Sequence, residues 1–365
     1  MRPADRRSLR AALAGLALLA ACRVEVDGGP ASFPSPAPVV MESDTLEAVC
    51  PERLPVLALP APVDLGVDAG RLLPAEDGLL VVAREGGLHR HAGGRTERLL
   101  EGGRDYALLG KRLLRLVEGR IEAFDHRPAG VPVLRSTLPG QSHDSSIVLL
   151  ERGTFVHSAF NERALILRRS IRSGAVEAAL LPVERDLLRT LLLRGPERLH
   201  EDEGILVGED AWLLYVPFVR DPVQALQTAT GRRWVLELAG GRRGEVRLEQ
   251  KTRTDVQPCP DCTRLVKVRG RVSFVPLYAG AAVEDGVFWI LRLDPAGATR
   301  AALLRVAVDV PVVRAWRLAF PIIPGALAVW RDSLAIAAGP DLWRLALPEP
   351  ASGARCSVVG PDRRS

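Results

Sequence analysis

The feature that most constrains the fold of this chain is a recurring hairpin pattern: a short apolar run, a tight polar turn and a second apolar run. The apolar run 79–82 follows a turn that ends at Gly78, and the run 287–291 follows the turn Glu284-Asp285-Gly286. Runs of this length with Gly, Asp or Ser at the reversal are typical of β-hairpins. A helical period near 3.6 residues is not sustained after residue 21. The pattern therefore predicts an all-β chain.

The spacing of the hairpins predicts how the strands are grouped. The first turns of successive units are 32, 43, 55, 78 and 46 residues apart, at Gly78, Gly110, Gly153, Gly208, Gly286 and Asp332. A second hairpin often follows the first, as in the similar runs 81–89 and 114–122. A repeat of about 40–50 residues with four strands is the period of a β-propeller blade.

We therefore expect a β-propeller of six or seven four-stranded blades. The interval of 78 residues holds either a missed blade or an insertion around residues 219–280. Tandem β-sandwiches are the alternative, because regular short strands fit both folds.

The N-terminal residues have a different composition from the rest of the chain. Four arginines precede an apolar run over residues 11–21, and Cys22 follows that run. Such a run is too short to span a bilayer, which needs about 20 residues, and it suits the apolar region of a secretory signal peptide. The sequence Leu19-Ala20-Ala21-Cys22 resembles the lipobox of bacterial lipoproteins.

The resemblance to bacterial lipoproteins implies that Cys22 becomes the acylated first residue of the mature chain. Each buried CH₂ contributes about 0.8 kcal/mol, so several acyl chains such as palmitate would hold the protein on a membrane. The resemblance also implies a place in the bacterial cell envelope, at the outer membrane, because Arg23 stands where lipoproteins kept at the inner membrane have Asp. An ordinary signal peptide that ends before a cysteine is the alternative.

Composition divides the chain into three parts. Residues 1–21 form the expected signal peptide, and residues 22–49 form a lipidated tether that is rich in Gly, Pro and Ser. The 17 residues of the most Pro-rich part, 24–40, would reach about 50 Å at roughly 3.1 Å each. Residues 50–365 are the expected propeller-like domain.

The basic charge balance does not indicate a nucleic-acid partner. The net charge of +5 falls to +2 without residues 1–21, which hold four arginines and one aspartate. The chain has many arginines but only Lys111, Lys251 and Lys267 as lysines, a bias that a GC-rich genome produces. Aromatic residues make up 5% of the chain, which is a thin supply for base stacking.

Four cysteines follow Cys22. Cys50 opens the propeller-like part and Cys356 nearly closes it, so a disulfide between them would fasten the two ends of a ring, contributing about 4–5 kcal/mol in the chain-entropy model. Cys259 and Cys262 flank Pro-Asp, and we expect a small disulfide that pins a surface loop. Thiol redox chemistry and metal binding are the alternatives, although no second CxxC and no nearby histidine is present.

The sequence holds no phosphate-binding loop, HExxH, GxSxG or EF-hand loop. Propeller ligands usually lie at the mouth of the central channel, and the segments that lead into the innermost strands carry ionisable side chains. The candidate ligand-binding residues in these segments are Asp105, Tyr106, His143, Asp144, His200 and Glu201. Together they could bind a cation, a sugar or a basic peptide, or do acid–base work. The alternative is that polar residues are simply what loops contain.

These observations favour a non-enzymatic binding or scaffold module, anchored in the envelope, whose propeller loops dock an envelope protein or polymer. We expect no cofactor and no metal. The alternative function is an envelope enzyme of propeller type (a hydrolase, a lyase or a quinone-dependent dehydrogenase) with its site at the central channel.

Overall fold

The computed structural model describes most of the chain after residue 45. The described residues are 46–49, 54–117, 120–128, 130–139, 146–150, 153–158, 164–182, 200–209, 211–238, 243–248, 253–257, 265–269, 272–294, 297–307 and 312–359. Among these residues no helix is long and apolar enough to cross a membrane.

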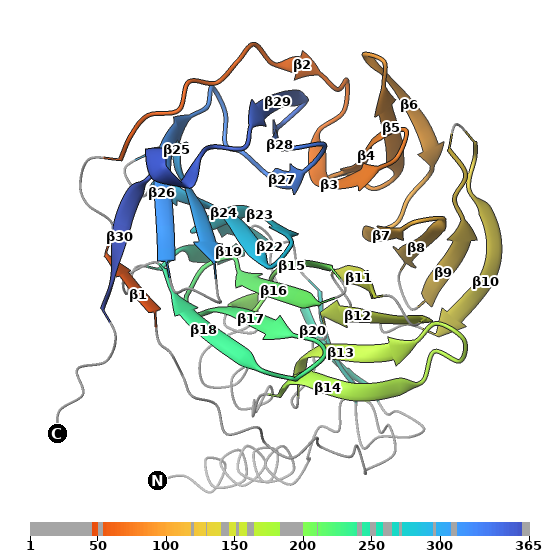
Figure 1. Cartoon of the computed structure of the whole chain (residues 1–365). Helices are drawn as coiled ribbons and strands as arrows, with labels where there is room; N and C mark the ends of the chain where they lie inside the picture. Colours follow the sequence, from red (N-terminus) through yellow and green to blue (C-terminus); the bar gives the residue numbers. More distant parts are fainter. Residues whose placement is uncertain are drawn as a thin grey trace, which may run out of the picture.

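The chain forms an all-β, six-bladed β-propeller whose blades are four-stranded antiparallel sheets (Figure 1). Blade one consists of β3 (Ala69–Ala75), β4 (Gly78–Ala83), β5 (Leu88–Ala92) and β6 (Arg95–Leu100). Blade two consists of β7 (Asp105–Leu109), β8 (Arg112–Val117), β9 (Arg120–Asp125) and β10 (Val133–Pro139). Blade three consists of β11 (Ile147–Leu150), β12 (Thr154–Ser158), β13 (Ala164–Ser170) and β14 (Val176–Pro182). Blade four consists of β15 (Gly204–Glu209), β16 (Trp212–Pro217), β17 (Val223–Gln227) and β18 (Arg233–Glu237). Blade five consists of β23 (Tyr278–Glu284), β24 (Val287–Asp294), β25 (Gly297–Ala307) and β26 (Val312–Ala319). Blade six consists of β27 (Ala326–Val329), β28 (Ser333–Ala338), β29 (Asp341–Ala346) and β2 (Val63–Asp64).

The prediction of a propeller is confirmed, and the blade number is six. Each predicted first turn lies at or next to the reversal between the first and second strands of a blade. The turn between β23 and β24 has left-handed backbone at both central residues, with φ of 49° at Asp285 and 72° at Gly286, as tight hairpins require. In blade four the reversal comes later than predicted, because Gly208 belongs to β15.

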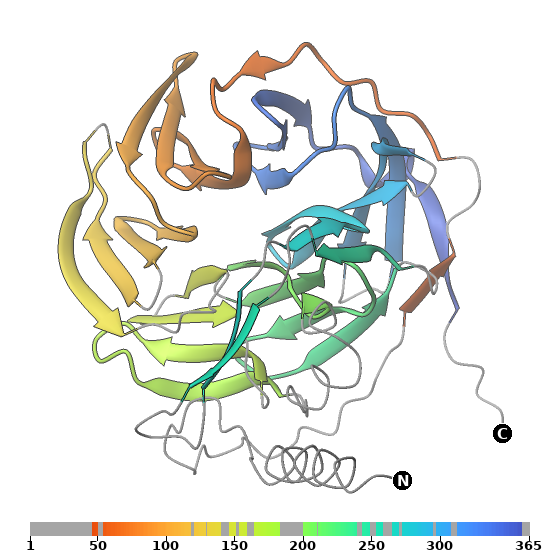
Figure 2. The same ribbon diagram turned by 180° about the vertical axis from the view of Figure 1, so that it is seen from behind.

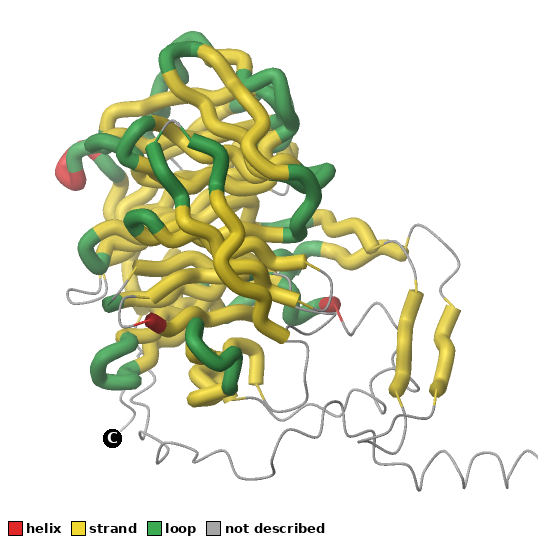
Figure 3. Tube along the Cα trace, turned by 90° about the vertical axis from the view of Figure 1, so that its right-hand side faces the viewer, coloured by secondary structure: helices red, strands yellow, loops and turns green. Residues whose placement is uncertain are grey.

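The interval of 78 residues contains an insertion and not a seventh blade. Between β18 and β23 lie two strand pairs: β19 (Glu245–Leu248) with β22 (Val272–Val275), and β20 (Arg253–Gln257) with β21 (Leu265–Arg269). The β20–β21 pair lies in front of the ring in Figure 2 and to one side of the body in Figure 3. Cys259 and Cys262 lie outside the described residues, in the connection between β20 and β21.

The ring closes by strand pairing. β2 comes from the N-terminal part of the chain and pairs with β29, with Val63 opposite Leu342. Two further strands join blades four and five into one sheet, because they lie between β18 and β26. They are the N-terminal strand β1 (Leu46–Val49) and the C-terminal strand β30 (Ala354–Val359), and β30 follows a short 3₁₀ helix at Pro350–Ser352. Cys50 lies outside the described residues, so the disulfide with Cys356 stays a prediction.

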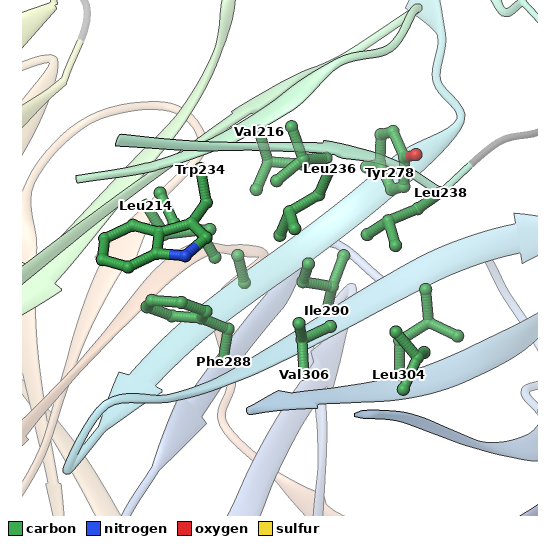
Figure 4. Close-up of a cluster of buried hydrophobic side chains, with 14 of the residues drawn as sticks. Leu214, Val216, Trp234, Leu236, Leu238, Tyr278, Phe288, Ile290, Leu304 and Val306 are labelled. Atoms are coloured by element: carbon green, nitrogen blue, oxygen red, sulfur yellow. The ribbon is translucent and has the colours of Figure 1, made fainter. Parts of the chain in front are cut away.

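A hydrophobic cluster lies between each pair of adjacent blades. Figure 4 shows the cluster between blades four and five, where Leu214, Trp234 and Leu236 face Phe288 and Ile290. The second strand of a blade therefore packs on both faces, and all six residues of β16 and of β28 are buried. This is why those strands read as continuous apolar runs rather than alternating ones.

All six inner strands run in the same direction along the propeller axis, because each four-stranded antiparallel blade returns the chain to the end at which it began. These strands are β3, β7, β11, β15, β23 and β27, and each contacts the next around the ring. We name the end of the channel at which the inner strands begin the N-mouth, and the end at which they finish the C-mouth. Asp105 begins β7 at the N-mouth, and Glu209 ends β15 at the C-mouth.

Candidate functional site: the central channel

The six inner strands enclose a cavity of about 370 Å³ on the propeller axis. This volume is within the usual range for small-molecule sites, about 300–1,000 Å³. Much of the wall is made by residues with little or no side chain, among them Gly70, Ala107, Gly204, Ala281 and Ala326. The channel stays open because side chains this small cannot fill it.

Arginines gather at the N-mouth. Arg71 belongs to β3, Arg84 follows β4 in the turn to β5, and Arg104 directly precedes β7, and all three line the cavity. The carboxylate of Asp105 lines the same end. Among the described residues, the charged groups that line the cavity at the N-mouth therefore come from blades one and two.

Asp105 ties three inner strands together. The Arg71 guanidinium forms an ion pair with the Asp105 carboxylate and donates from Nη1 to the Ile147 carbonyl at 3.0 Å. The Ile147 amide donates to Asp105 Oδ2 at 2.9 Å. Burial raises the pKa of the Asp105 carboxyl, against the opposing effects of the Arg71 charge and the Ile147 amide. The result is a fixed Arg71 side chain between β3, β7 and β11.

Arg84 lies across the N-mouth from blade one toward blade six. Its Nε lies 3.4 Å from Asp68 Oδ1, and both side chains are about half exposed. Its Nη2 lies so close to Gly325 that a Cβ at position 325 would come within 2.1 Å of it. The absence of a side chain at Gly325 therefore makes room for the guanidinium.

Both arginines keep unused donors. A guanidinium has five N–H groups, and in the described part of the chain the side-chain hydrogen bonds of Arg71 all leave from Nη1. Among the same residues, the contact of Arg84 with Asp68 is made through Nε. The remaining N–H groups of Arg71 and Arg84 at the N-mouth are therefore available to a ligand.

Among the described residues, the charged side chain that lines the cavity at the C-mouth is acidic. Glu209 lines the cavity there and accepts a hydrogen bond from the Gly286 amide at 3.0 Å. Burial, together with the carboxylates of Asp285, Asp332 and Glu209, raises the pKa of Glu284. The described lining of the cavity therefore carries arginines at the N-mouth and a glutamate at the C-mouth.

Of the four candidate residues in the segments that lead into β7 and β11, the structure describes the two at the start of β7. Asp105 lines the cavity. Tyr106 is fully buried in the cluster between blades one and two, and its hydroxyl donates to the Gly102 carbonyl. His143 and Asp144 lie outside the described residues.

The two predicted residues of blade four lie in the turn before β15. His200 Nδ1 lies 2.6 Å from Glu203 Oε1, and Glu201 lies 3.9 Å from the Arg220 guanidinium. Neither His200 nor Glu201 belongs to the residues that line the cavity. Within the described ranges, no group of three or more His, Cys, Asp and Glu side chains is arranged to hold a metal ion.

Sequence reasoning missed Arg71 and Arg84. Arg71 precedes two leucines within a strand-length run, and an arginine in such a run is a signal of a charged group that faces a channel or a partner. Arg84 carries no such signal, because a charged residue in a hairpin turn is ordinary.

No family model and no curated protein matches this chain. Similar solved structures include a glutaminyl cyclase from Myxococcus xanthus (13% identity, TM-score 0.37, covering 84% of this chain and 97% of that one) and a streptogramin B lyase (13% identity, TM-score 0.45, covering 79% and 97%). The propeller domain of Myceliophteria thermophila Swd1 is 9% identical, with a TM-score of 0.42 and coverage of 77% and 97%. Identities this low concern the fold alone, so the function is argued from this chain's own residues.

Proposed function

We propose that this protein is a non-enzymatic binding module of the bacterial cell envelope that docks an envelope protein or polymer at the N-mouth of its central channel. The observation that carries the proposal is the open cavity whose mouth bears arginine donors that the described residues leave unused. Propeller channels offer loops from all blades around one axis, which suits docking of a chain end or a projecting loop.

The proposal includes a lipid anchor at Cys22 and a tether over residues 22–49. Its support is the lipobox-like sequence that ends at Cys22, directly after the apolar run. Metabolic labelling with palmitate tests it. Label is expected in the wild type and absent from Cys22→Ser, and equal labelling of the two proteins would remove the anchor from the proposal.

Site-specific photo-crosslinking in intact cells tests docking at the N-mouth. A photoreactive amino acid at position 104 is expected to give discrete adducts with an envelope component. The same amino acid at position 95 is the matched control, because Arg95 is an exposed arginine of β6, the outer strand of blade one. Adducts from both positions, or from neither, would contradict docking at the N-mouth.

A further inference from the structure

We propose that the N-mouth binds an anionic group, a carboxylate or a phosphate, between the guanidinium groups of Arg71 and Arg84. This inference rests on the proposed function and names the chemistry of the docked group. It also gives a role to the N–H groups of the two arginines that their contacts with the described residues leave unused.

The balance of donors and acceptors along the cavity carries the inference. Three arginines and two carboxylates line the cavity. Both carboxylates already accept hydrogen bonds, Asp105 from Arg71 and Ile147, and Glu209 from Gly286. Arg71 and Arg84 therefore offer a ligand guanidinium N–H donors that their contacts with the described residues do not use. Guanidinium groups bind carboxylate and phosphate oxygens strongly and with fixed geometry.

The two guanidinium groups are suited to act together. The Arg71 side chain is 18% exposed and is held in place by Asp105, so its interactions are less weakened by water than those of a surface arginine. The Arg84 side chain is half exposed and rests on Gly325. One arginine is thus fixed and partly desolvated, and the other can move onto an incoming anion.

The cavity lining at the opposite mouth is less favourable to the same ligand. Among the described residues, Glu209 lines the cavity at the C-mouth, and its negative charge disfavours an anion there. An anionic group is therefore favoured at the N-mouth, where Arg71 and Arg84 line the cavity.

The size of the cavity limits what can enter. The volume of about 370 Å³ lies near the lower end of the range for small-molecule sites, about 300–1,000 Å³. A chain end, one side chain or one phosphate unit fits, whereas a globular surface does not. The anion then comes from the C-terminus or an acidic side chain of a protein, or from a phosphate of an envelope polymer.

Calorimetric titration of the full chain with matched probes tests the anion inference. The probes are acetylated trialanine with a free C-terminal carboxylate, the same peptide as its carboxamide, and inorganic phosphate. The carboxylate peptide, phosphate or both are expected to bind at least about tenfold more tightly than the carboxamide. Binding of the peptide alone indicates a protein source, binding of phosphate alone indicates a polymer, and equal or absent binding of all three probes overturns the inference.

Two variants test the site itself. Arg84→Ala is expected to weaken anion binding by about tenfold, and Gly325→Ala is expected to weaken it while every charge is kept, because the new Cβ displaces the Arg84 guanidinium. Arg95→Ala removes the same charge from the outer edge of blade one and is expected to bind as the wild type does. Wild-type anion affinity in both Arg84→Ala and Gly325→Ala would overturn the inference.

The crosslinking experiment keeps the two proposals separable. If position 104 gives adducts and the probes show no preference for anions, only the anion inference fails. If position 104 gives no adducts, docking at the N-mouth fails whatever the probes do.

Discussion

A single carboxylate, that of Asp105, organises the N-mouth of the channel. It is 5% exposed and accepts hydrogen bonds from β3 and β11 while it begins β7. The sequence pointed to Asp105 because an ionisable residue directly precedes an apolar run. It could not point to Arg71 as the partner, because the contact depends on how blades one and two are placed around the axis.

The Arg71–Asp105 pair yields a stability prediction. Arg71→Ala leaves a buried carboxylate without its opposite charge, and breaking a buried pair in this way costs about 3–5 kcal/mol. Equilibrium urea unfolding measures the loss. The double variant Arg71→Ala/Asp105→Ala is expected to lose less than the sum of the two single variants, and strict additivity would contradict the coupling.

His126 yields a prediction about pH. Its side chain is 3% exposed, neither ring nitrogen has a hydrogen-bond partner among the described residues, and burial lowers its pKa. A histidine whose pKa is lowered on folding favours the unfolded state as the pH falls through its ordinary value, about 6.5. The free energy of unfolding is therefore expected to fall on acidification.

His126→Leu is expected to reduce that fall. The measurement is urea unfolding at about pH 7.5 and about pH 5.5, on either side of the ordinary histidine pKa. At the higher pH the variant is expected to be at least as stable as the wild type, because two buried, unpaired ring nitrogens are removed. His200→Gln is the control, and the same pH dependence in His126→Leu as in the wild type would contradict the assignment.

At the scale of elements, the first two strands of each blade were the most predictable part of the fold. Their apolar runs are continuous because both faces are covered by neighbouring blades, and their turns carry Gly or Asp at left-handed positions such as Asp285 and Gly286. The insertion lies where the sequence predicted it, but its four strands could not be predicted from the repeat. β19 pairs with β22 and β20 pairs with β21, outside the four-stranded unit of a blade. The short strand β2 was missed, since two residues carry no periodicity.

The pairing of β1 with β30 sharpens the disulfide prediction. The antiparallel register matches Val49 with Ser357, the residues next in sequence to Cys50 and Cys356. Cys50 itself lies outside the described residues. Peptide mapping under non-reducing conditions is expected to find Cys50 linked to Cys356, and Cys259 linked to Cys262.

Free thiols at these positions in protein isolated without a reductant would contradict both disulfides. If the long-range disulfide forms, Cys50→Ser is expected to lower the stability by up to about 4–5 kcal/mol in the chain-entropy model, measured as a fall in Tm.

At the scale of the whole molecule, closure of the ring depends on a short segment next to β2. Leu65 is 1% exposed and packs in the cluster between blades six and one, and its amide donates to the Pro340 carbonyl at 2.7 Å. The repeat spacing indicated the ring, but the sequence alone could not reveal that hydrogen bonding of β2 to β29 closes it. A pairing between residues this far apart leaves no local pattern in the sequence.

Leu65→Ala tests the importance of this closure. Loss of a fully buried leucine costs about 2–5 kcal/mol. Hydrogen exchange is expected to rise more in blade six than in blade three. Val63→Ala is the control, because that side chain is 44% exposed, and an equal loss in the two variants would contradict a special role for Leu65.

The origin of β2 has a consequence for synthesis of the chain. Val63 and its partner Leu342 are 279 residues apart, so five blades can form before the sixth can be completed. Until then the face of blade one that finally meets blade six, which includes Leu72 and Leu79, has no neighbour to cover it. Chains with such exposed apolar faces aggregate and bind chaperones. The growing, still open ring is therefore the form of this protein that most needs protection in the cell.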